Sequence, residues 1–488
     1  MTGIVILGGL HHKNKNGIEL MSKVRNIPIV ITNDEQFAAR HPYPYVIVTD
    51  RPKIVADFSN KKVLIGPHLD HNNNKLVDKN QTCNCLSAWV EVLLKAYGAT
   101  CNFVYLPFGV DVDKFKSGAE ERSKVFLYAK LRDPTLIAKI EKSYKFDAVF
   151  RYGSYQESDY CNFLKTAKFG VWIGRHESQG FAVQEALSCN VPLLVLDVDD
   201  VYDEYSVHWQ RIDNMPSATV IPYWDDSCGE VCKKPYDDFT SKLALLESKI
   251  KNNEYSPREY ILKTLKPSVC MDRFCQYFGI GLDVVCVTSV VNVSSNPLCY
   301  TNVRSIYTPE QRLEQTLNSI QSIKSRLPHA CIVLVEGSKL NKSQKIALTE
   351  QVDYLFDASH MSSIHCPYKS LAEVEMLEYA ISCISSKIKI QTFYKLSGRY
   401  TLNDRFQPND WANQTKAKYQ DGSMSTIFYS VKSDDMANFL SIINESKTSL
   451  AKGQSVEEYF CNSGLWQNKA EYIGVNGNIA VDGYVINI

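Results

Sequence analysis

The sequence predicts an α/β protein built from more than one parallel sheet. Short continuous apolar runs, typical of strands buried on both faces, alternate with longer segments whose apolar residues recur at helical spacing. The alternation repeats along most of the chain. Because 488 residues exceed what one hydrophobic core usually organises, we expect two to four domains.

The composition is that of a globular protein that is neither basic nor acidic. Apolar residues make up 44% of the chain, and Lys+Arg and Asp+Glu number 54 each. A nucleic-acid-binding protein usually has a basic bias, so we expect no nucleic-acid partner. No apolar run reaches the length of a membrane span, and the first one is too short for a signal peptide. We therefore expect a soluble, cytoplasmic protein; the sequence does not indicate its oligomeric state.

The fifteen cysteines are odd in number and scattered along the chain. Many lie in apolar runs, where a reduced thiol acts as a small hydrophobic side chain. Neither Cys83 and Cys85 nor Cys228 and Cys232 have the spacing of a zinc site with a matching second half. We expect free thiols and no structural metal.

The first part of the chain reads as a small α/β domain. Strands are predicted at 4–7, 27–31, 45–49, 62–65 and 102–106, and helices at 17–24 and 86–97. Gly8 and Gly9 follow the first strand directly, where missing side chains allow a ligand to approach the backbone. His68 and Asp70 follow the fourth strand, and loops after strands carry sites in this architecture. The alternative is a polar loop in which His68 is a cap or a surface residue.

A second α/β series begins near residue 124. Strands are predicted at 125–128, 148–150, 169–173, 191–196 and 218–222, and helices at 134–142, 158–165, 181–189, 236–251 and 257–276. Pro267 should break or kink the last helix. Lys130 and Arg132 follow the first strand of this series, and Tyr152 and Arg175 are further polar candidates. The alternative for each of these four is a surface residue without a role in binding.

The turn between residues 173 and 181 carries the strongest site pattern. Glu177 lies in the turn, Glu185 follows eight positions later, and Gly180 lies between them. A helix that starts at Ser178 would separate the two carboxylates by about two turns. Its amino end favours a phosphate, and a carboxylate accepts two adjacent hydroxyls, so the pattern suits a ligand with a diphosphate and a sugar or ribose diol. The alternative is a Glu177 that only complements the helix dipole and a solvated Glu185.

A third α/β series begins near residue 281. Strands are predicted at 283–291, 331–335, 354–356 and 389–394, and helices at 310–327, 343–352 and 371–386. The glycine-rich segment 474–483 reads as strands and turns, with a loop over a cleft.

Two motifs resemble the retaining GT-B glycosyltransferases of the family 4 type. Residues 177–186 match the E-x7-E pattern of that family, apart from Ser178, where the family often has glycine. Residues 107–115 match the P-x-G-V-D-x-x-x-F pattern at the crossover between its two Rossmann-like halves. The resemblance implies an acceptor-side domain at 1–108 and a donor-binding domain at 109–279 that ends in a helix crossing back.

The same resemblance implies a role for each candidate residue of this half. Glu177 lies against the transferred sugar, Gly180 and Phe181 meet the diphosphate, and Glu185 holds the ribose. It further implies that Gly8 and Gly9 face the interdomain cleft, that His68 contacts the donor sugar, and that Lys130 and Arg132 steady the leaving diphosphate. A nucleotide-diphosphate sugar is then the co-substrate, and this half needs no metal or other cofactor.

Residues 282–488 resemble the nucleotide half of a GT-A-like glycosyltransferase domain. Enzymes of that kind hold Mg²⁺ or Mn²⁺ on paired aspartates, which this segment lacks at the matching place, so the sequence does not support a metal here. Lys395 and Arg399 would replace the metal's charge. Further candidates for the same cleft are Glu336, Asp353, Lys369 and Asp482. The alternative is a domain without activity that binds acceptor or assembles the protein.

The sequence therefore predicts a glycosyltransferase with two transferase domains, acting on an oligosaccharide or other glycan acceptor. The alternatives are a single-activity GT-B enzyme whose C-terminal domain only binds acceptor, and a nucleotide-sugar-binding scaffold without turnover. A Rossmann-like sugar epimerase is disfavoured, because no G-x-G-x-x-G follows the first strand. The donor sugar, its base and the acceptor are not indicated.

Overall fold

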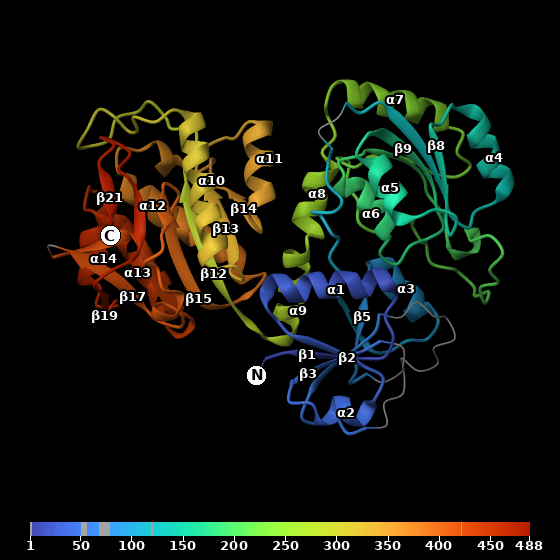
Figure 1. Ribbon diagram of the computed structural model, residues 1–488, viewed down its shortest axis with the longest axis horizontal. Helices are drawn as coiled ribbons and strands as arrows, with labels where there is room; N and C mark the ends of the chain where they lie inside the picture. Colours follow the sequence, from blue (N-terminus) through green and yellow to red (C-terminus); the bar gives the residue numbers. More distant parts are fainter. Residues whose placement is uncertain (1, 50–55, 68–78, 119–120, 421) are drawn as a thin grey trace. The chain divides into compact units, whose positions relative to one another are not determined.

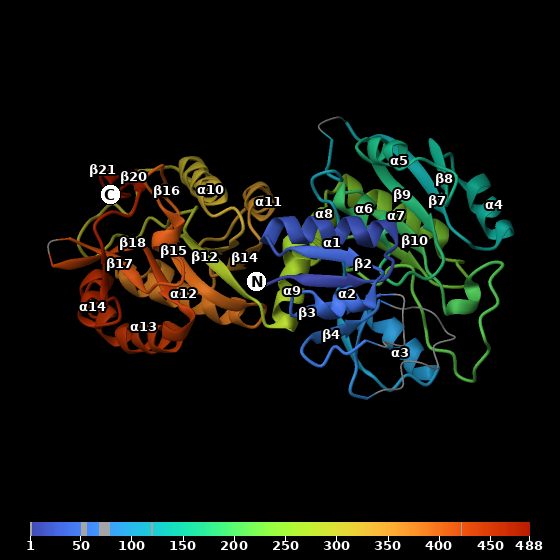
Figure 2. The same cartoon turned by 60° about the horizontal axis from the view of Figure 1, so that its bottom comes forward.

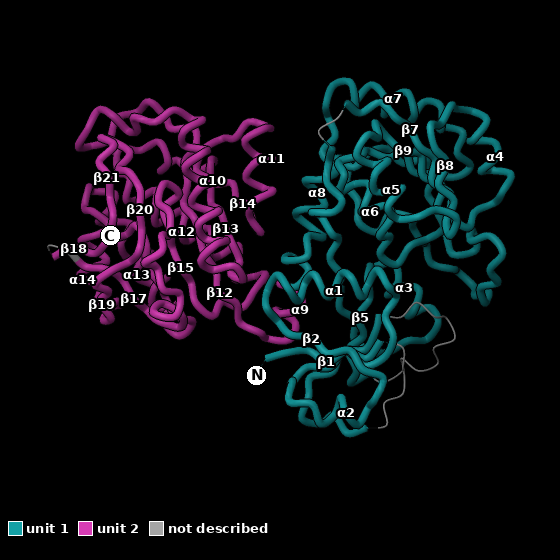
Figure 3. Tube along the Cα trace, viewed as in Figure 1, with its two compact units in different colours: residues 1–271 teal, residues 272–488 magenta. Residues whose placement is uncertain are grey.

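The computed structural model describes residues 2–49, 56–67, 79–118, 121–420 and 422–488 (Figure 1). His68 and Asp70 lie outside the described residues. The chain forms two compact units, residues 1–271 and 272–488, which are coloured separately in Figure 3. The break between them falls inside helix α9 (Pro267–Phe278), ahead of the predicted domain limit at residue 279.

The first sheet of the N-terminal unit is parallel throughout and has the order β2-β1-β3-β4-β5-β6. Its strands are β1 (Ile4–Leu7), β2 (Ile29–Thr32), β3 (Tyr45–Val48), β4 (Lys62–Ile65), β5 (Thr82–Cys85) and β6 (Asn102–Tyr105). The helices are α1 (His12–Arg25), α2 (Glu35–Arg40) and α3 (Ala88–Ala96). Figure 2 shows α1 running beside the strands of this sheet.

Three features of this region differ from the prediction. Helix α1 begins at His12 rather than Gly17, because His11 caps a polar first turn that has no apolar periodicity. Strand β5 was not predicted, since its sequence TCNC lacks a run of apolar or β-branched residues. In α3, apolar spacing predicts a buried face of Trp89, Val92, Leu93 and Ala96. Leu93 is buried, but Val92 is 53% exposed while Val90 and Leu94 are buried, so the buried face is rotated from the predicted one.

The second sheet of this unit is also parallel, in the order β11-β10-β9-β7-β8. Its strands are β7 (Lys124–Ala129), β8 (Ala148–Arg151), β9 (Ala167–Ile173), β10 (Leu193–Leu196) and β11 (Gly229–Cys232). The helices are α4 (Pro134–Ser143), α5 (Glu157–Leu164), α6 (Phe181–Ser188), α7 (Phe239–Lys251) and α8 (Pro257–Thr264). The predicted break at Pro267 is confirmed, because α8 ends before it and α9 starts on it.

The predicted strand at 218–222 is wrong. The amides of Ala218 and Val220 bond to Asp199 O and the Asp197 carboxylate, at 3.0 and 2.8 Å, instead of to a strand ladder. β11 takes the place of the fifth strand. Its short sequence, GEVC, contains a glutamate and does not read as an apolar run.

The C-terminal unit has a mixed sheet of order β14-β13-β12-β15-β18-β17-β19 and a small sheet of order β16-β20-β21. β14, β13, β12 and β15 are parallel, and β18 is antiparallel to β15. The strands are β12 (Gly281–Ser289), β13 (Cys331–Glu336), β14 (Tyr354–Asp357), β15 (Lys389–Ser397), β16 (Tyr400–Leu402), β17 (Lys416–Gln420), β18 (Ser423–Lys432), β19 (Asn468–Ala470), β20 (Val475–Asn478) and β21 (Val485–Asn487). The helices are α10 (Pro309–Arg326), α11 (Lys342–Gln351), α12 (Lys369–Ser385), α13 (Met436–Leu450) and α14 (Val456–Asn462).

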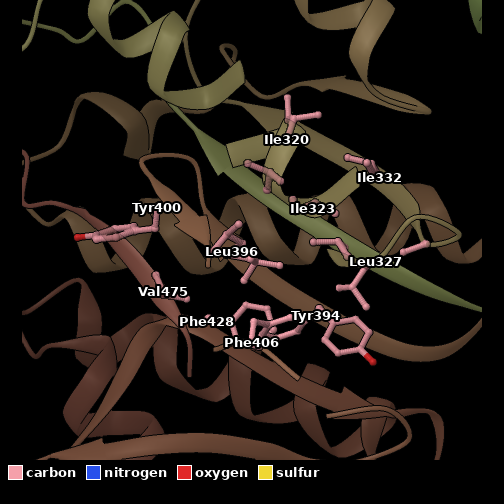
Figure 4. Close-up of a cluster of buried hydrophobic side chains, with 14 of the residues drawn as sticks. Ile320, Ile323, Leu327, Ile332, Tyr394, Leu396, Tyr400, Phe406, Phe428 and Val475 are labelled. Atoms are coloured by element: carbon pink, nitrogen blue, oxygen red, sulfur yellow. The ribbon is translucent and has the colours of Figure 1, made fainter. Parts of the chain in front are cut away.

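One large apolar cluster lies within this C-terminal unit (Figure 4). Ile320 and Ile323 of α10 pack against the sheet, where Leu396 and Phe428 are fully buried. Val475 of β20 joins the same cluster. The small sheet is therefore part of this unit's core.

Each of the three α/β sheets has a topological switch point, where later strands are added on both sides of the first strand. β1 lies between β2 and β3, β7 between β8 and β9, and β12 between β13 and β15. Ligands of open α/β sheets bind beyond the carboxyl ends of the strands at such a point. We therefore expect functional side chains directly after the strands at these switch points, which are β1, β7, β9, β12 and β15. Among the described residues, no helix is both long and apolar enough to cross a bilayer.

Candidate active site

An ion pair occupies the switch point of the second sheet. Lys130 follows β7 and Glu177 follows β9, and Lys130 Nζ lies 2.6 Å from Glu177 Oε1. The two side chains are 11% and 13% exposed. Lys130 Nζ also lies 4.5 Å from the centre of the Tyr152 ring. The pair is thus largely buried, and both side chains retain a small exposed area.

The loop that carries Glu177 is held by its backbone. The Glu177 amide donates to Thr219 O, and Trp89 Nε1 donates to Glu177 O, each at 2.9 Å. Gly180 has a φ of 83° and is the N-cap of α6, which begins at Phe181. A helix beginning at Ser178 is therefore wrong, and Glu177 lies on the loop before the helix. Gly180 is needed because residues with side chains are strained in this left-handed conformation.

Glu185 lies in α6 and is almost fully buried, at 4% exposure. Its carboxylate accepts a hydrogen bond from Lys13 Nζ, and Lys13 also lies 2.5 Å from Glu157 Oε2. Lys114 binds the other oxygen of Glu157. Burial raises the pKa of Glu185 to about 7, against the lowering effect of Lys13. A solvated Glu185 is therefore excluded, and Lys13, which the sequence did not single out, is its partner.

A stacked aromatic pair, Tyr128 and Trp172, lies near both Glu177 and Glu185. Tyr128 stacks on Trp172 with ring centres 3.9 Å apart, and its hydroxyl lies 3.2 Å from that of Tyr155. Burial raises the pKa of Tyr128, and the charges of Glu177 and Glu185 add to this rise. The Tyr128 hydroxyl therefore lies within electrostatic reach of both carboxylates.

The loop after β1 faces the same region. Gly8 has a φ of 110°, and Thr49 Oγ1 donates to Gly9 O at 2.8 Å. Burial lowers the pKa of His11, and the charges of His12, Lys130 and Lys13 lower it further. His11 is therefore close enough to Lys130 to sense its charge. Sequence reasoning missed it, although it follows the glycine pair that was singled out.

Arg132 occupies a different position from the one predicted. It is 3% exposed, and its Nη1 donates to Gly174 O at 2.8 Å and to Leu196 O at 3.2 Å. Its Nη2 donates to the Tyr236 hydroxyl. The guanidinium thus ties together the ends of β9 and β10, which does not support contact with a diphosphate.

Two buried amide side chains clamp the segment between the two sheets. Asn84 of β5 exchanges hydrogen bonds of 3.0 and 2.9 Å with the backbone carbonyl and amide of Leu106. Gln179 of the glutamate loop does the same with Phe108, at 2.6 and 3.0 Å. A Cβ on Gly109 would lie 2.6 Å from Pro267 Cα, so only glycine fits there. The crossover segment is therefore held from both sheets.

The C-terminal unit has a cavity of its own at the switch point of its mixed sheet. Its empty volume, including the open mouth, is about 940 Å³. Thr288 and Ser289 at the end of β12 and Ser397 at the end of β15 line it. The charged lining residues are Arg304, Arg312, Lys369, Glu373 and Arg399. Residues 479–481 also line it, in agreement with the predicted loop over a cleft.

Not all predicted residues of this unit reach the cavity. Lys395 is fully buried, and its Nζ donates to Glu373, to Thr426 O and, at 2.7 Å, to Ser397 Oγ. All three of its protons are used within the protein, which differs from the prediction that it replaces a metal ion. Asp482 is exposed and caps the Tyr484 amide at 3.0 Å.

Glu336 and Asp353 have structural contacts. Glu336 is buried and accepts from the amides of Val291 and Ser338 at 2.8 and 3.0 Å. The Asp353 carboxylate accepts from the Ile332 amide at 2.9 Å. Among the described residues, no three His, Cys, Asp or Glu side chains come together in a way that would hold a metal ion.

Comparison with known proteins gives structural matches alone. No family model matches the sequence, and no curated protein matches it. The structure is similar to the lipopolysaccharide outer core galactosyltransferase WaaB in its apo form, with 13% identity and a TM-score of 0.37 over 56% of this chain and 98% of that chain. It is also similar to a point mutant of S. aureus TarM in complex with fondaparinux, α-GlcNAc-glycerol and UDP, with 14% identity and a TM-score of 0.33 over 47% of this chain and 54% of that chain. A further TarM structure matches with 13% identity and a TM-score of 0.31, over 47% of this chain and 53% of that chain.

Proposed function

We propose that residues 1–271 form a GT-B glycosyltransferase that moves a sugar from a nucleotide-diphosphate sugar to a hydroxyl of a glycan acceptor. The observation that supports this best is the Lys130–Glu177 pair at the switch point of the second sheet. Gly180 caps the start of α6 and lies between this pair and the second carboxylate, Glu185, which is the fifth residue of that helix. These groups match the parts of a nucleotide-diphosphate sugar. Glu177 suits the sugar, Lys130 and the start of α6 suit the diphosphate, and Glu185 suits the ribose.

The leaving diphosphate is stabilised by Lys130 and by the amino end of α6. As the glycosidic bond breaks, negative charge grows on the diphosphate, and a fixed cation in a largely buried site lowers the energy of that state. The first amides of α6, around Phe181, have no helical acceptor and favour an anion. Gly180 leaves these amides accessible, because it has no side chain in front of them.

The two glutamates bind the two ends of the donor. Glu177 accepts from hydroxyls of the transferred sugar, and its bond to Lys130 keeps sugar and diphosphate in a defined relative position. Glu185 accepts from the adjacent ribose hydroxyls in its ionised form. Lys13 holds that carboxylate when no donor is bound and transfers its contact to Glu157, which it already touches.

The reaction retains the configuration of the sugar, as in the family that the E-x7-E motif resembles. The acceptor hydroxyl attacks from the side on which the diphosphate leaves, so leaving-group stabilisation and positioning are the main tasks of the protein. We assign no general base. Gly8, Gly9 and His11 form the wall of the site contributed by the first sheet.

A donor panel with matched variants tests this function. UDP-, GDP- and dTDP-sugars are screened with the full chain for transfer and for donor hydrolysis. For the donor that reacts, Glu177→Gln and Lys130→Met should each lower kcat by about 100-fold or more, because each removes a charge next to the reacting bond. The controls Glu19→Gln and Lys139→Met, both exposed helix residues, should retain full activity. Donor binding by the unaltered chain without any turnover would favour a scaffold and contradict the proposal.

A second transferase activity in residues 272–488 is supported by the cavity at the β12/β15 switch point. Two consecutive additions to one glycan would follow, with the C-terminal unit acting as the GT-A-like partner. Glu177→Ala and a Lys369→Ala/Arg399→Ala double variant should then abolish different product linkages. Loss of the same single linkage in both would leave one activity and an acceptor-binding role for the C-terminal unit.

A further inference from the structure

Three cations of the C-terminal cavity form no ion pair with any described residue. Arg312 is 6% exposed, and its Nε donates to Val290 O at 2.8 Å. Within the described part of the chain, none of Arg312, Lys369 and Arg399 forms an ion pair, and the buried Nε of Arg399 has no hydrogen-bond partner. Gathering three cations around one cavity without an ion-pair partner for any of them costs free energy, which a bound anion would offset.

The acidic side chain in the cavity offsets the charge of these cations only in part. Glu373 lies one helical turn after Lys369 in α12, but its carboxylate is bound by the fully buried Lys395. The fourth lining cation, Arg304, donates to the backbone carbonyls of Asn296, Ile364 and Cys366. Arg312, Lys369 and Arg399 are therefore the groups whose charge remains available to a ligand.

The electrostatics agree with this geometry. Burial and the charge of Arg399 together lower the pKa of Lys369 to about 8, against the raising effect of Glu373 and Glu457. The same two causes lower the pKa of Arg312 to about 10, against Glu336. Lys369 is nevertheless an exposed residue that lines the cavity, so solvent screens part of its charge. Arg399 thus repels both Lys369 and Arg312, and an anion bound between them would offset this repulsion.

A second, polar hollow adjoins the cation cavity. Its empty volume is about 660 Å³, and it shares Tyr300, Lys369 and Glu373 with the first. Beyond these it is lined by Gln454 and Glu457, among other polar groups. Amide and carboxylate side chains of this kind bind hydroxyl groups. A ligand that spans both spaces would carry its charge on one side of Lys369 and hydroxyl groups on the other.

We propose that the cavity at the carboxyl ends of β12 and β15 binds an organic phosphate or diphosphate with a hydroxyl-bearing remainder, without a divalent metal ion, through Arg312, Lys369 and Arg399. Each arginine donates paired hydrogen bonds to the phosphate oxygens. The Lys369 ammonium, which lines both hollows, binds the phosphate as a point charge. Lys395 is a positioning residue that holds Glu373 away from the anion. This inference does not depend on the sugar transfer proposed for residues 1–271. It deepens the second activity proposed for residues 272–488, because it names the class of ligand that the same cavity binds.

Calorimetric titration of the full chain with inorganic pyrophosphate in EDTA tests the proposal. Lys369→Met and Arg399→Gln should each weaken binding about tenfold or more, since each removes a charge-assisted contact. The control Lys387→Met, an exposed lysine just after α12, should bind as the unaltered chain does. Lys130→Met should remove any pyrophosphate binding to the donor site of residues 1–271 and leave the binding that depends on Lys369 and Arg399, which separates the two sites.

The pH dependence provides a second readout that a folding defect would not reproduce. Pyrophosphate affinity should fall as pH rises through about 8, where free Lys369 loses its proton, and Lys369→Met should remove this fall. UDP and a sugar 1-phosphate should each compete with pyrophosphate, and the tighter competitor identifies the remainder of the ligand. Equal binding by Lys369→Met, Arg399→Gln and Lys387→Met would overturn the proposal, as would binding that requires Mg²⁺ or no binding at millimolar pyrophosphate.

Discussion

Glu185 shows how burial prepares a carboxylate for binding. In water a glutamate is ionised at neutral pH, but here burial raises its pKa to about 7, even with Lys13 in contact. A hydroxyl pair donates poorly to a protonated carboxyl, so the donor competes with a proton as well as with Lys13. The charged neighbours that bear on this residue are Lys13 of α1, Glu157 of α5 and Lys114 of the crossover segment.

Donor affinity should therefore depend on pH through Glu185. The ionised fraction of a group with a pKa of about 7 rises roughly tenfold between pH 6 and 8, and donor affinity should rise with it. Glu185→Gln cannot titrate and should give weaker but pH-independent binding. Titrations of the reactive donor across this range check both statements. A profile that persists in Glu185→Gln would assign the pH dependence to another group.

The sequence predicted some of the site residues and missed others. Glu177, Gly180 and Glu185 were singled out because a motif places the two glutamates eight positions apart, and that spacing is local. Lys13 was not, since its contact with Glu185 joins residues 172 positions apart. Arg132 was predicted at the diphosphate because it follows a strand, but its side chain turns back to the carbonyls of Gly174 and Leu196.

At the scale of the element, the crossover segment is held by amide side chains as well as by apolar burial. Asn84 and Gln179 each satisfy both backbone groups of a buried residue, Leu106 and Phe108. Gln179 belongs to the loop of Glu177, so this clamp also fixes where the glutamate loop lies relative to the crossover segment. An apolar replacement would leave a buried N–H and a buried C=O without partners.

Gln179→Leu should lower the free energy of unfolding by about 2 to 4 kcal/mol, because two buried backbone groups lose their hydrogen bonds. The exposed residue Gln36 offers a matched control, and Gln36→Leu should change stability by less than about 0.5 kcal/mol. Urea unfolding followed by tryptophan fluorescence measures both. A Gln179→Leu variant as stable as the control would mean that the backbone of Phe108 finds other partners.

Most elements were predicted where apolar periodicity is strong, and those that were missed lack it. The elements predicted near 4–7, 62–65, 134–142 and 331–335 all have a matching strand or helix. β5 is held by parallel pairing with β4 and β6, and its cysteines are buried although its sequence is not β-like. α1 begins five residues early because His11 caps a polar turn that carries no apolar signal.

At the scale of the whole molecule, the recurring feature is a first strand with neighbours on both sides. The carboxyl ends of β7 and β9 carry Lys130 and Glu177, and those of β12 and β15 lead to a cavity with four cations. The same topology therefore places charge at the same edge in both units. In the first unit Lys130 and Lys13 are paired with carboxylates. In the second unit Arg312, Lys369 and Arg399 form no ion pair with any described residue.

The two units should unfold in separate steps, because a compact unit with its own core tends to fold as one. Leu127→Ala in β7 and Leu396→Ala in β15 each remove a fully buried side chain, at a cost of about 2 to 5 kcal/mol. Differential scanning calorimetry should show two transitions, each variant lowering a different one. A single transition that both variants lower alike would mean that the units unfold together.

The sequence by itself determined the α/β class, the break at Pro267 and the residues of the glutamate loop, because each of these depends on near neighbours in the chain. The C-terminal unit was predicted as a βαβ series, yet the antiparallel strands that complete its mixed sheet, and the cavity there, became apparent only from the structure. Tertiary structure decided which charges are used up inside the protein and which remain free. Lys395 and Lys369 look alike in the sequence, but one is bound by Glu373, Ser397 and Thr426 while the other lines an open cavity. The physical reason is that a charge acquires its role from the groups that surround it, and those groups come from distant parts of the chain.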